Sequence, residues 1–223
     1  MNLVEYSRLS GRFLTSLNSN FITLIPKKDK PSTFADFRPI SLCNLIYKLI
    51  AKVVAQRLKP FLDKFISPQQ FAFLKNHQIS EPIVITQEVL HSVKSRNKSV
   101  LVLKLDLTKA FDRVNWSYIK LILMQIGMPL EGVNWIMGCI TSVNFSLLIN
   151  GSTSHFFTAS RGIRQGCPLS PLLFILVIEG LSLLIDDARR HGLVKEIKIS
   201  HQLSLTHLLF VDDVILFGFG TCE

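Results

Sequence analysis

The sequence predicts an α+β fold, in which an antiparallel sheet is backed by helices, and three observations support this prediction. Apolar residues recur with a helical period through much of the N-terminal third, which indicates helices there. Short apolar runs typical of strands alternate with further helical segments along the rest of the chain. Two pairs of these runs meet at tight turns, Asn150-Gly151 and Val211-Asp212-Asp213, and such turns join antiparallel strands.

The first elements are a strand and a long helix. The run Phe21–Ile25 is short and apolar, and Pro26 closes it, which predicts a strand. After a lysine-rich loop over residues 27–36, apolar residues from Leu45 to Leu58 follow the helical period. Proline removes a backbone donor and disrupts a helix interior, so we expect Pro60 to limit the extent of this helix.

A helix and a strand follow in the middle of the chain. Ser80-Glu81-Pro82 is a good helix start for a segment that runs to about Lys94. The run Val100–Leu105 is almost wholly apolar and predicts a strand buried on most of its surface. This strand ends on an acid, Asp106.

The second half of the chain is predicted to contain three helices and two hairpins. Asparagine caps helices, glycine stops them, and Asn-Gly is a strong hairpin signal, which sets the expected boundaries at Asn115, Gly127 and Asn150. The predicted elements are helices at Trp116–Ile126 and Glu131–Ser142, strands at Phe145–Ile149 and Thr153–Thr158, a loop at Arg161–Pro168, a helix at about Ser170–Arg190, and strands at Leu203–Phe210 and Val214–Phe217.

The composition narrows the class of protein. With 48% hydrophobic and 18% charged residues in 223, the chain has the make-up of a packed domain, or of two small domains that share a core. The net charge of +9 favours an anionic partner, with nucleic acid first and an anionic membrane surface second. No signal peptide is visible, and the longest apolar stretch, Leu172–Ile185, is too short to span a membrane, so we expect an intracellular protein. The four cysteines have neither zinc-site spacing nor a disulfide pattern: Cys43, Cys139, Cys167 and Cys222.

Three acids break the apolar pattern at the ends of predicted strands. Asp106 ends one strand, and Asp212 and Asp213 lie side by side where two other strands meet. Neighbouring carboxylates repel one another, and a divalent cation would offset that repulsion. Phosphoryl transfer uses two Mg²⁺ ions about 4 Å apart with hard oxygen ligands, and these acids would supply them if the strands are adjacent. Taken singly, the pair is also compatible with a solvated turn, and Asp106 with a helix cap or a partner of Lys104 or Lys109.

Five sequence runs together resemble those of one polymerase family. Leu103–Asp112, Gly162–Pro171 and Phe210–Asp213 are similar to reverse-transcriptase motifs A, B and C, in that order, and Leu24–Lys27 and Phe37–Leu42 resemble motifs of the fingers. The set resembles the non-LTR retrotransposon (LINE-type, plant-like) reverse transcriptases over roughly residues 20 to 219. A group II intron-type reverse transcriptase is the second enzyme reading, and an inactive remnant that at most binds nucleic acid is the third.

This resemblance implies a fold, a domain division and an activity. It implies a fingers and palm fold, with an extension at 1–20, a fingers-like region at 21–99 and a palm at 100–223 that is truncated before the thumb. The implied activity is RNA-directed DNA polymerisation, with an RNA template, a DNA primer and dNTPs as partners and two Mg²⁺ ions, or Mn²⁺ in their place, as cofactors. Access to chromosomal DNA, which retrotransposition requires, implies the nucleus, and the oligomeric state is left open.

The resemblance also implies roles for single residues. Asp106 and Asp212 would be the main metal ligands, with Asp213 as the third acid. Phe111 would be a steric gate against the 2′-hydroxyl of ribonucleotides, although a core phenylalanine also suits its position. The remaining implied roles are triphosphate contacts for Lys27 and Arg38, contacts to the nascent base pair for Gln165 and Gly166, and phosphate contacts for Arg161 and Arg164. Without the resemblance, these four basic residues are ordinary cations.

Overall fold

The structure, a computed structural model, describes residues 3–11, 17–73, 80–97, 99–199 and 204–219. They form two compact units, each built from two segments of the chain. The first unit combines Met1–Phe61 with Phe111–Phe174, and the second combines Leu62–Ala110 with Ile175–Glu223. This division crosses the expected boundary between residues 99 and 100, because each unit is completed by a segment from the other half of the chain.

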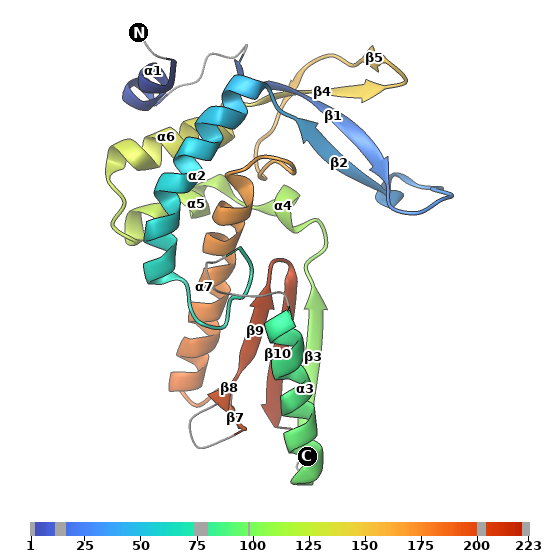
Figure 1. Ribbon diagram of the computed structural model, residues 1–223, viewed down its shortest axis with the longest axis vertical. Coiled ribbons are helices and arrows are strands. Elements are labelled where there is room, and N and C mark those ends of the chain that lie inside the picture. Colours follow the sequence, from blue (N-terminus) through green and yellow to red (C-terminus); the bar gives the residue numbers. More distant parts are fainter. Residues whose placement is uncertain (1–2, 12–16, 74–79, 98, 200–203, 220–223) are drawn as a thin grey trace. The chain divides into compact units, whose positions relative to one another are not determined.

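The first unit contains a mixed sheet and a set of helices (Figure 1). Its elements are α1 (Leu3–Ser10), β1 (Ser19–Pro26), the 3₁₀ helix η2 (Phe34–Asp36), β2 (Phe37–Leu42), most of α2 (Leu45–Phe65), most of α4 (Ala110–Arg113), α5 (Trp116–Gln125), α6 (Leu130–Thr141), β4 (Asn144–Ile149), β5 (Ser152–Thr153), β6 (Phe157–Thr158) and the start of α7 (Ser170–Arg190). Strands β1 and β2 are antiparallel, whereas β1 and β4 are parallel, with Ser19 opposite Asn144. The Asn115 side chain accepts a hydrogen bond from the Ser117 N–H at 2.8 Å, which confirms the predicted cap of α5.

The second unit is built on an antiparallel sheet in the order β3-β10-β9. Its elements are the end of α2, α3 (Ser80–Ser95), β3 (Val100–Asp106), the rest of α7, β7 (Ile197–Lys198), β8 (Ser204–Leu205), β9 (His207–Phe210) and β10 (Asp213–Phe219). Helices cover both faces of the sheet. Phe217 packs with Val89 of α3 on one face, and Val214 packs with Ile178 of α7 on the other. The expected α+β class, with an antiparallel sheet backed by helices, is therefore confirmed.

Pro60 does not limit α2, which continues through it to Phe65. Proline leaves the carbonyl of the residue four positions earlier without its helical donor, and that residue, Gln56, is exposed to water. Leu58 and Leu62, on either side of the proline, are almost fully buried. Their burial stabilises the helical path that the proline alone would end.

Strand β3 is far more exposed than predicted. Leu101, Leu103 and Leu105 are 60%, 44% and 38% exposed, and they lie on the same face because side chains alternate along a strand. Val102 lies on the other face, next to Phe217 and the core cluster there. An apolar run shows that a strand forms, but the neighbours that cover each face come from distant parts of the chain. The segment predicted as one strand over Thr153–Thr158 is likewise divided, into β5 and β6.

Candidate active site

The backbone of the second unit brings the three predicted metal-binding acids together. In the antiparallel pair of β3 and β10, Asp106 lies directly opposite Asp213. The Leu107 N–H donates a hydrogen bond to the backbone oxygen of Asp212 at 3.1 Å. Residues directly opposite one another in an antiparallel pair present their side chains on the same face. The strand adjacency on which the predicted two-metal chemistry depends is thus present.

The carboxylates themselves are accessible, and one of them has a cationic partner. Asp106 and Asp212 are exposed, and Asp213 lies 3.0 Å from the ammonium group of Lys104. Lys104 therefore pairs with Asp213. The alternative in which Lys104 is the partner of Asp106 is wrong. An ion pair this exposed contributes at most about 1 kcal/mol, so it is easily rearranged. Within the described ranges, no three His, Cys, Asp or Glu side chains are gathered around a metal position. The donor set of carboxylate oxygens nevertheless fits Mg²⁺.

The turn that carries Asp212 is strained. Phe210 pairs with Asp213, which leaves Val211 and Asp212 as a two-residue loop. Val211 has a φ of +54°, in the left-handed region that a β-branched residue rarely adopts. Strain of this kind costs on the order of 1–3 kcal/mol and is concentrated at functional sites. The turn that presents Asp212 therefore forms against the steric preference of Val211.

Replacing Val211 with glycine is expected to stabilise the protein by about 1 kcal/mol. Glycine adopts a positive φ without steric cost, and this gain exceeds the larger backbone entropy that glycine loses on folding. The free energy of unfolding, measured by urea titration, checks this. Val211→Ala is the matched control, since it keeps a Cβ and should recover only part of the gain. A Val211→Gly protein less stable than wild type would contradict the strain at this turn.

In the first unit, the loop that resembles motif B is docked onto the segment that follows motif A. The Gly162 N–H donates to the Val114 carbonyl at 2.7 Å, and the Ile163 N–H donates to the Phe111 carbonyl at 2.8 Å. Gly162 has a φ of +89°, and a Cβ at this position would lie 2.9 Å from the Asp112 carbonyl oxygen. This close approach explains why glycine is needed there. Sequence reasoning assigned no role to Gly162, although its place in a Gly-containing loop was a signal for one.

Phe111 is held rigidly in this arrangement. Its ring stacks on Phe174 of α7, with 4.7 Å between ring centroids and 13° between ring planes. Stacked aromatic pairs gain about 0.5–1.5 kcal/mol beyond the burial of their area. Phe111 is itself only half-buried. A ring that is fixed on one side and accessible on the other suits the predicted steric gate.

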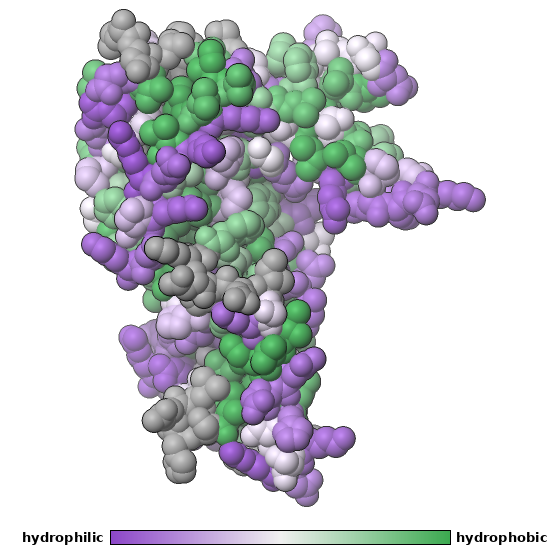
Figure 2. Space-filling model, in the orientation of Figure 1, coloured by the Kyte–Doolittle hydropathy of each residue, from purple (hydrophilic) through white to green (hydrophobic). Residues whose placement is uncertain are grey.

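The Gln165 and Gly166 turn contacts strand β2. The Ser41 N–H donates to the Gln165 carbonyl at 3.0 Å, and a Cβ on Gly166, whose φ is +95°, would lie 3.2 Å from the Ser41 oxygen. Arg38 is exposed on the same strand. Lys27 follows directly after β1, and its ammonium group donates to the Ala35 carbonyl at 3.0 Å. The loop over residues 27–36, which projects at the right of Figure 2, presents a hydrophilic surface with exposed lysines.

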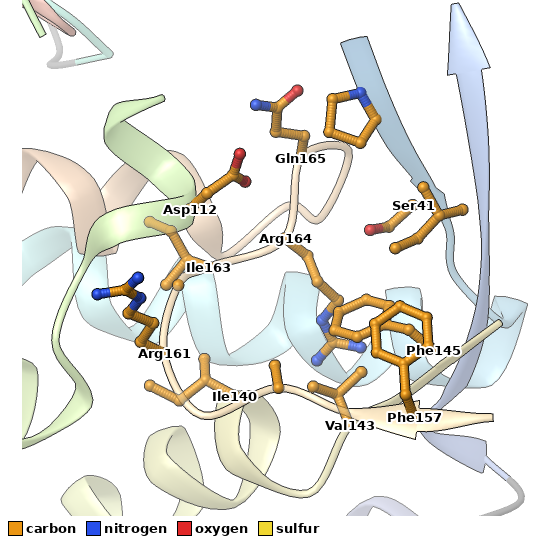
Figure 3. Close-up of a pocket in the computed structure, with 14 residues that line it drawn as sticks. Ser41, Asp112, Ile140, Val143, Phe145, Phe157, Arg161, Ile163, Arg164 and Gln165 are labelled. Carbon is orange, nitrogen blue, oxygen red and sulfur yellow. The ribbon is translucent and has the colours of Figure 1, made fainter. Parts of the chain in front are cut away.

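The two candidate phosphate-binding arginines have opposite environments. Arg161 is exposed, whereas Arg164 is only 5% exposed. The Arg164 guanidinium donates to Asn18 Oδ1 at 2.6 Å and to the Cys139 carbonyl, and it stacks over the Tyr47 ring at 3.8 Å from the centroid. This burial contradicts the predicted contact between Arg164 and template or primer phosphates, because its donors are directed at protein atoms. Figure 3 shows the side chains of Arg161 and Arg164 projecting from the loop in different directions.

A cavity of about 260 Å³ lies beside this loop in the first unit (Figure 3). The Phe145 and Phe157 rings form part of its wall, with centroids 6.0 Å apart. Arg161, Asp112 and Gln165 also line it.

The structure thus brings the predicted site residues together in two groups. Asp106, Asp212 and Asp213 belong to the second unit. The other predicted residues belong to the first unit: Lys27, Arg38, Phe111, Arg161, Arg164, Gln165 and Gly166. Inside the first unit, backbone hydrogen bonds link the segment after motif A, the motif B loop and β2.

Comparison with known proteins gives consistent similarities. The sequence model of the family described as "Reverse transcriptase (RNA-dependent DNA polymerase)" matches residues 25–223. The chain is 31% identical over 206 residues to the "Transposon TX1 uncharacterized 149 kDa protein" of Xenopus laevis, a match that covers 92% of this chain and 15% of that protein. It is 27% identical over 217 residues to the "Retrovirus-related Pol polyprotein from type-1 retrotransposable element R2" of Popillia japonica, covering 96% of this chain and 29% of that protein.

The fold resembles that of a solved telomerase structure. Apo telomerase from Candida tropicalis, truncated from its C-terminal domain, aligns with a TM-score of 0.62 and 15% identity, over 97% of this chain and 47% of that one. The chain spans less than a third of the length of the two curated relatives. In the part of the chain that the structure describes, no helix combines the length and apolar character needed to cross a membrane.

Proposed function

This chain belongs to the reverse transcriptase (RNA-dependent DNA polymerase) family, and from that premise we propose that it extends a DNA primer on an RNA template, as part of a non-LTR retrotransposon protein. The observation that carries the proposal is the pairing of Asp106 with Asp213, next to Asp212, at one end of the β3-β10-β9 sheet. Copying at chromosomal DNA would place the protein in the nucleus. We also propose residues 1–20 as an extension, 21–99 as fingers and 100–223 as palm.

The three aspartates would hold two Mg²⁺ ions, with Asp106 and Asp212 as the main ligands. When bound, the ions would activate the primer 3′-hydroxyl and neutralise the triphosphate of the incoming dNTP. The accessible carboxylates of Asp106 and Asp212 suit this role. Asp213 forms an ion pair with Lys104, which supports its role as the third acid beside the two main metal ligands.

The residues of the first unit would bind and select the nucleotide. Lys27 and Arg38 are exposed cations, suited to the triphosphate oxygens. Gln165 and Gly166 would approach the nascent base pair, where the missing side chain of glycine allows close backbone contact. Arg161 would contact a template or primer phosphate, a contact that positions nucleic acid without reading its sequence.

The experiment that tests this function is primer extension on an RNA template with dNTPs and Mg²⁺ or Mn²⁺. Wild type is expected to extend the primer, and Asp212→Asn to lose extension, because the amide keeps the shape of the side chain but not its charge. Asp63→Asn, an exposed aspartate of the same unit, is the matched control and should retain activity. Absence of extension by wild type would refute the proposed activity, and nucleic-acid binding without extension would support the inactive-remnant alternative.

Replacing Phe111 with valine is expected to increase ribonucleotide incorporation relative to deoxynucleotide by about 10–200-fold, the range expected when one steric contact is removed. The ratio of kcat/KM for dNTP and rNTP on the same primer and template measures this. Phe156→Val removes an exposed aromatic side chain elsewhere in the unit and should leave the ratio unchanged. An unchanged ratio in Phe111→Val would show that Phe111 only packs against Phe174.

A further inference from the structure

A buried polar cluster in the second unit has no part in the chemistry described above. Glu179 is 4% exposed, and Ser182 and His207 are fully buried. Buried charge is costly unless it is hydrogen-bonded, so a carboxylate at this depth needs an explanation. Its only signal in the sequence is that Glu179 and Ser182 interrupt an otherwise apolar helix.

The cluster forms a continuous chain of hydrogen bonds. The Ser67 N–H donates to Glu179 Oε1 and the Ser67 hydroxyl to Oε2, both at 3.1 Å. Ser67 Oγ lies 3.0 Å from Ser182 Oγ, and Ser182 Oγ lies 2.7 Å from His207 Nε2. His207 Nδ1 in turn lies 2.8 Å from Thr206 Oγ1.

The same cluster fixes the strand that leads to Asp212. Glu179 binds the segment at Ser67, and this segment pairs with β9. The Leu209 N–H donates to the Gln69 carbonyl at 2.9 Å, and the Phe71 N–H donates to the Leu209 carbonyl at 3.1 Å. Ser182 binds β9 directly, at His207. Helix α7 therefore holds β9 through one polar cluster, and β9 ends at the turn that carries Asp212.

Each hydroxyl group has one hydrogen to donate, so in every contact of the chain one group donates and the other accepts. The donors can therefore all point toward Glu179 or all point away from it. With Glu179 ionised, Ser67 donates to the carboxylate, Ser182 donates to Ser67, and His207 donates from Nε2 and accepts at Nδ1. With Glu179 protonated, the carboxyl donates to Ser67 and every hydroxyl reverses. Ser182 then donates to Nε2, and His207 carries its proton on Nδ1, donating to Thr206.

We propose that Glu179, Ser67, Ser182, His207 and Thr206 form a hydrogen-bond relay that couples the protonation of Glu179 to the tautomer of His207 and so adjusts the strand that leads to Asp212. The relay itself stands apart from polymerase activity, whereas its effect at Asp212 rests on the proposed function. When the direction reverses, donor and acceptor exchange roles in every hydrogen bond of the chain. Because Thr206 and His207 supply one end of that chain, the reversal acts on β9.

The electrostatic surroundings place the switch in the physiological range. Burial raises the pKa of Glu179 to about 7, against the opposing effect of the two Ser67 hydrogen bonds, and Asp186 two turns along α7 raises it further. Burial also lowers the pKa of His207, which Asp186 partly offsets, and this favours the neutral imidazole. Among the described residues, the segment over 66–71 carries no charge, and β10 places the neutral Leu216 opposite His207.

The test is ¹⁵N NMR of the His207 imidazole in the full chain, from about one unit below to about one unit above the Glu179 pKa of about 7. Loss of the resonances in His207→Gln assigns them. We expect the Nδ1–H tautomer at the low end and the Nε2–H tautomer at the high end. A single tautomer across the range in wild type would overturn the proposal.

Glu179→Gln separates the relay from general packing. The amide accepts from the Ser67 N–H and donates to the Ser67 hydroxyl, so it should lock His207 in the Nδ1–H form at every pH. Ser182→Ala breaks the chain and should also remove the dependence, whereas Glu88→Gln, an exposed glutamate of the same unit, should leave it intact. A tautomer change that persists in either Glu179→Gln or Ser182→Ala would overturn the relay.

The effect on the active site is measured separately by primer extension. We expect kcat in wild type to change near the Glu179 pKa, this change to be absent in Glu179→Gln and Ser182→Ala, and KM for dNTP to be unaffected. A tautomer switch with no change in kcat would overturn the coupling to Asp212. A wild-type protein that shows the switch but extends no primer would refute the proposed function and leave the relay standing.

Discussion

Replacing Asp106 with asparagine is expected to reduce RNA-templated extension by ~10³-fold or more, while the free energy of unfolding without metal stays the same or rises. Asp106 lies opposite Asp213, and the next residue, Leu107, is hydrogen-bonded to the backbone of Asp212. Three negative charges therefore lie at the same end of one sheet. Lys104 offsets only part of that charge. Without metal assistance, the activation free energy of phosphoryl transfer rises by several kcal/mol, and this rise accounts for the loss in rate.

The gain or constancy in stability distinguishes a functional acid from a structural one. Without metal, removing one of three neighbouring carboxylates lowers their repulsion, whereas removing a structural acid would destabilise the fold. Single-turnover primer extension and urea unfolding of the same preparations measure the two effects. Asp63→Asn is again the control and should change neither. An Asp106→Asn protein that unfolds more easily and polymerises normally would contradict the assigned role.

Replacing Arg164 with methionine is expected to destabilise the protein by about 2–4 kcal/mol, because a buried acceptor left unsatisfied costs about 1–3 kcal/mol and a desolvated cation–π contact contributes up to about 2 kcal/mol. The substitution removes the donor to Asn18 Oδ1 and the cation stacked on Tyr47. Asn18 is fully buried, so its oxygen would be left without that partner. Urea unfolding of the wild-type and variant chains measures the loss.

Arg161 supplies the matched control for Arg164. Arg161→Met should change the free energy of unfolding by no more than about 0.5 kcal/mol, because the side chain is exposed. The same variant should weaken nucleic-acid binding and reduce the salt dependence of that binding, as expected for the loss of one phosphate contact. Arg164→Lys should fail to restore stability, since an ammonium group cannot both stack flat on Tyr47 and donate to two acceptors. Normal stability with weakened RNA binding in Arg164→Met would restore the original phosphate-contact prediction.

Much of the fold is predictable because its signals are local. The bounds of α7 agree with the helical period of its apolar residues, and α5 begins after the predicted Asn115 cap. The pairing of the hairpin at Asp212 is correct because a short turn between apolar runs leaves few other ways to pair the strands. Its first strand, predicted over Leu203–Phe210, is divided into β8 and β9, and Leu203 lies outside the described residues. The parallel pairing of β1 with β4 had no such signal, since these strands are distant in sequence.

The sequence by itself determined the family and the α+β class, and it singled out the three acids as candidate metal ligands, because all of these depend on residue type and on spacing within single segments. Only the tertiary structure decided which side chains are exposed and which are paired. It buried Arg164 against the face of the Tyr47 ring, exposed Leu101 on β3, and enclosed Glu179 in a hydrogen-bonded cluster. The physical reason is that burial and hydrogen bonding are properties of neighbours, and in each of these cases the neighbours come from distant segments of the chain.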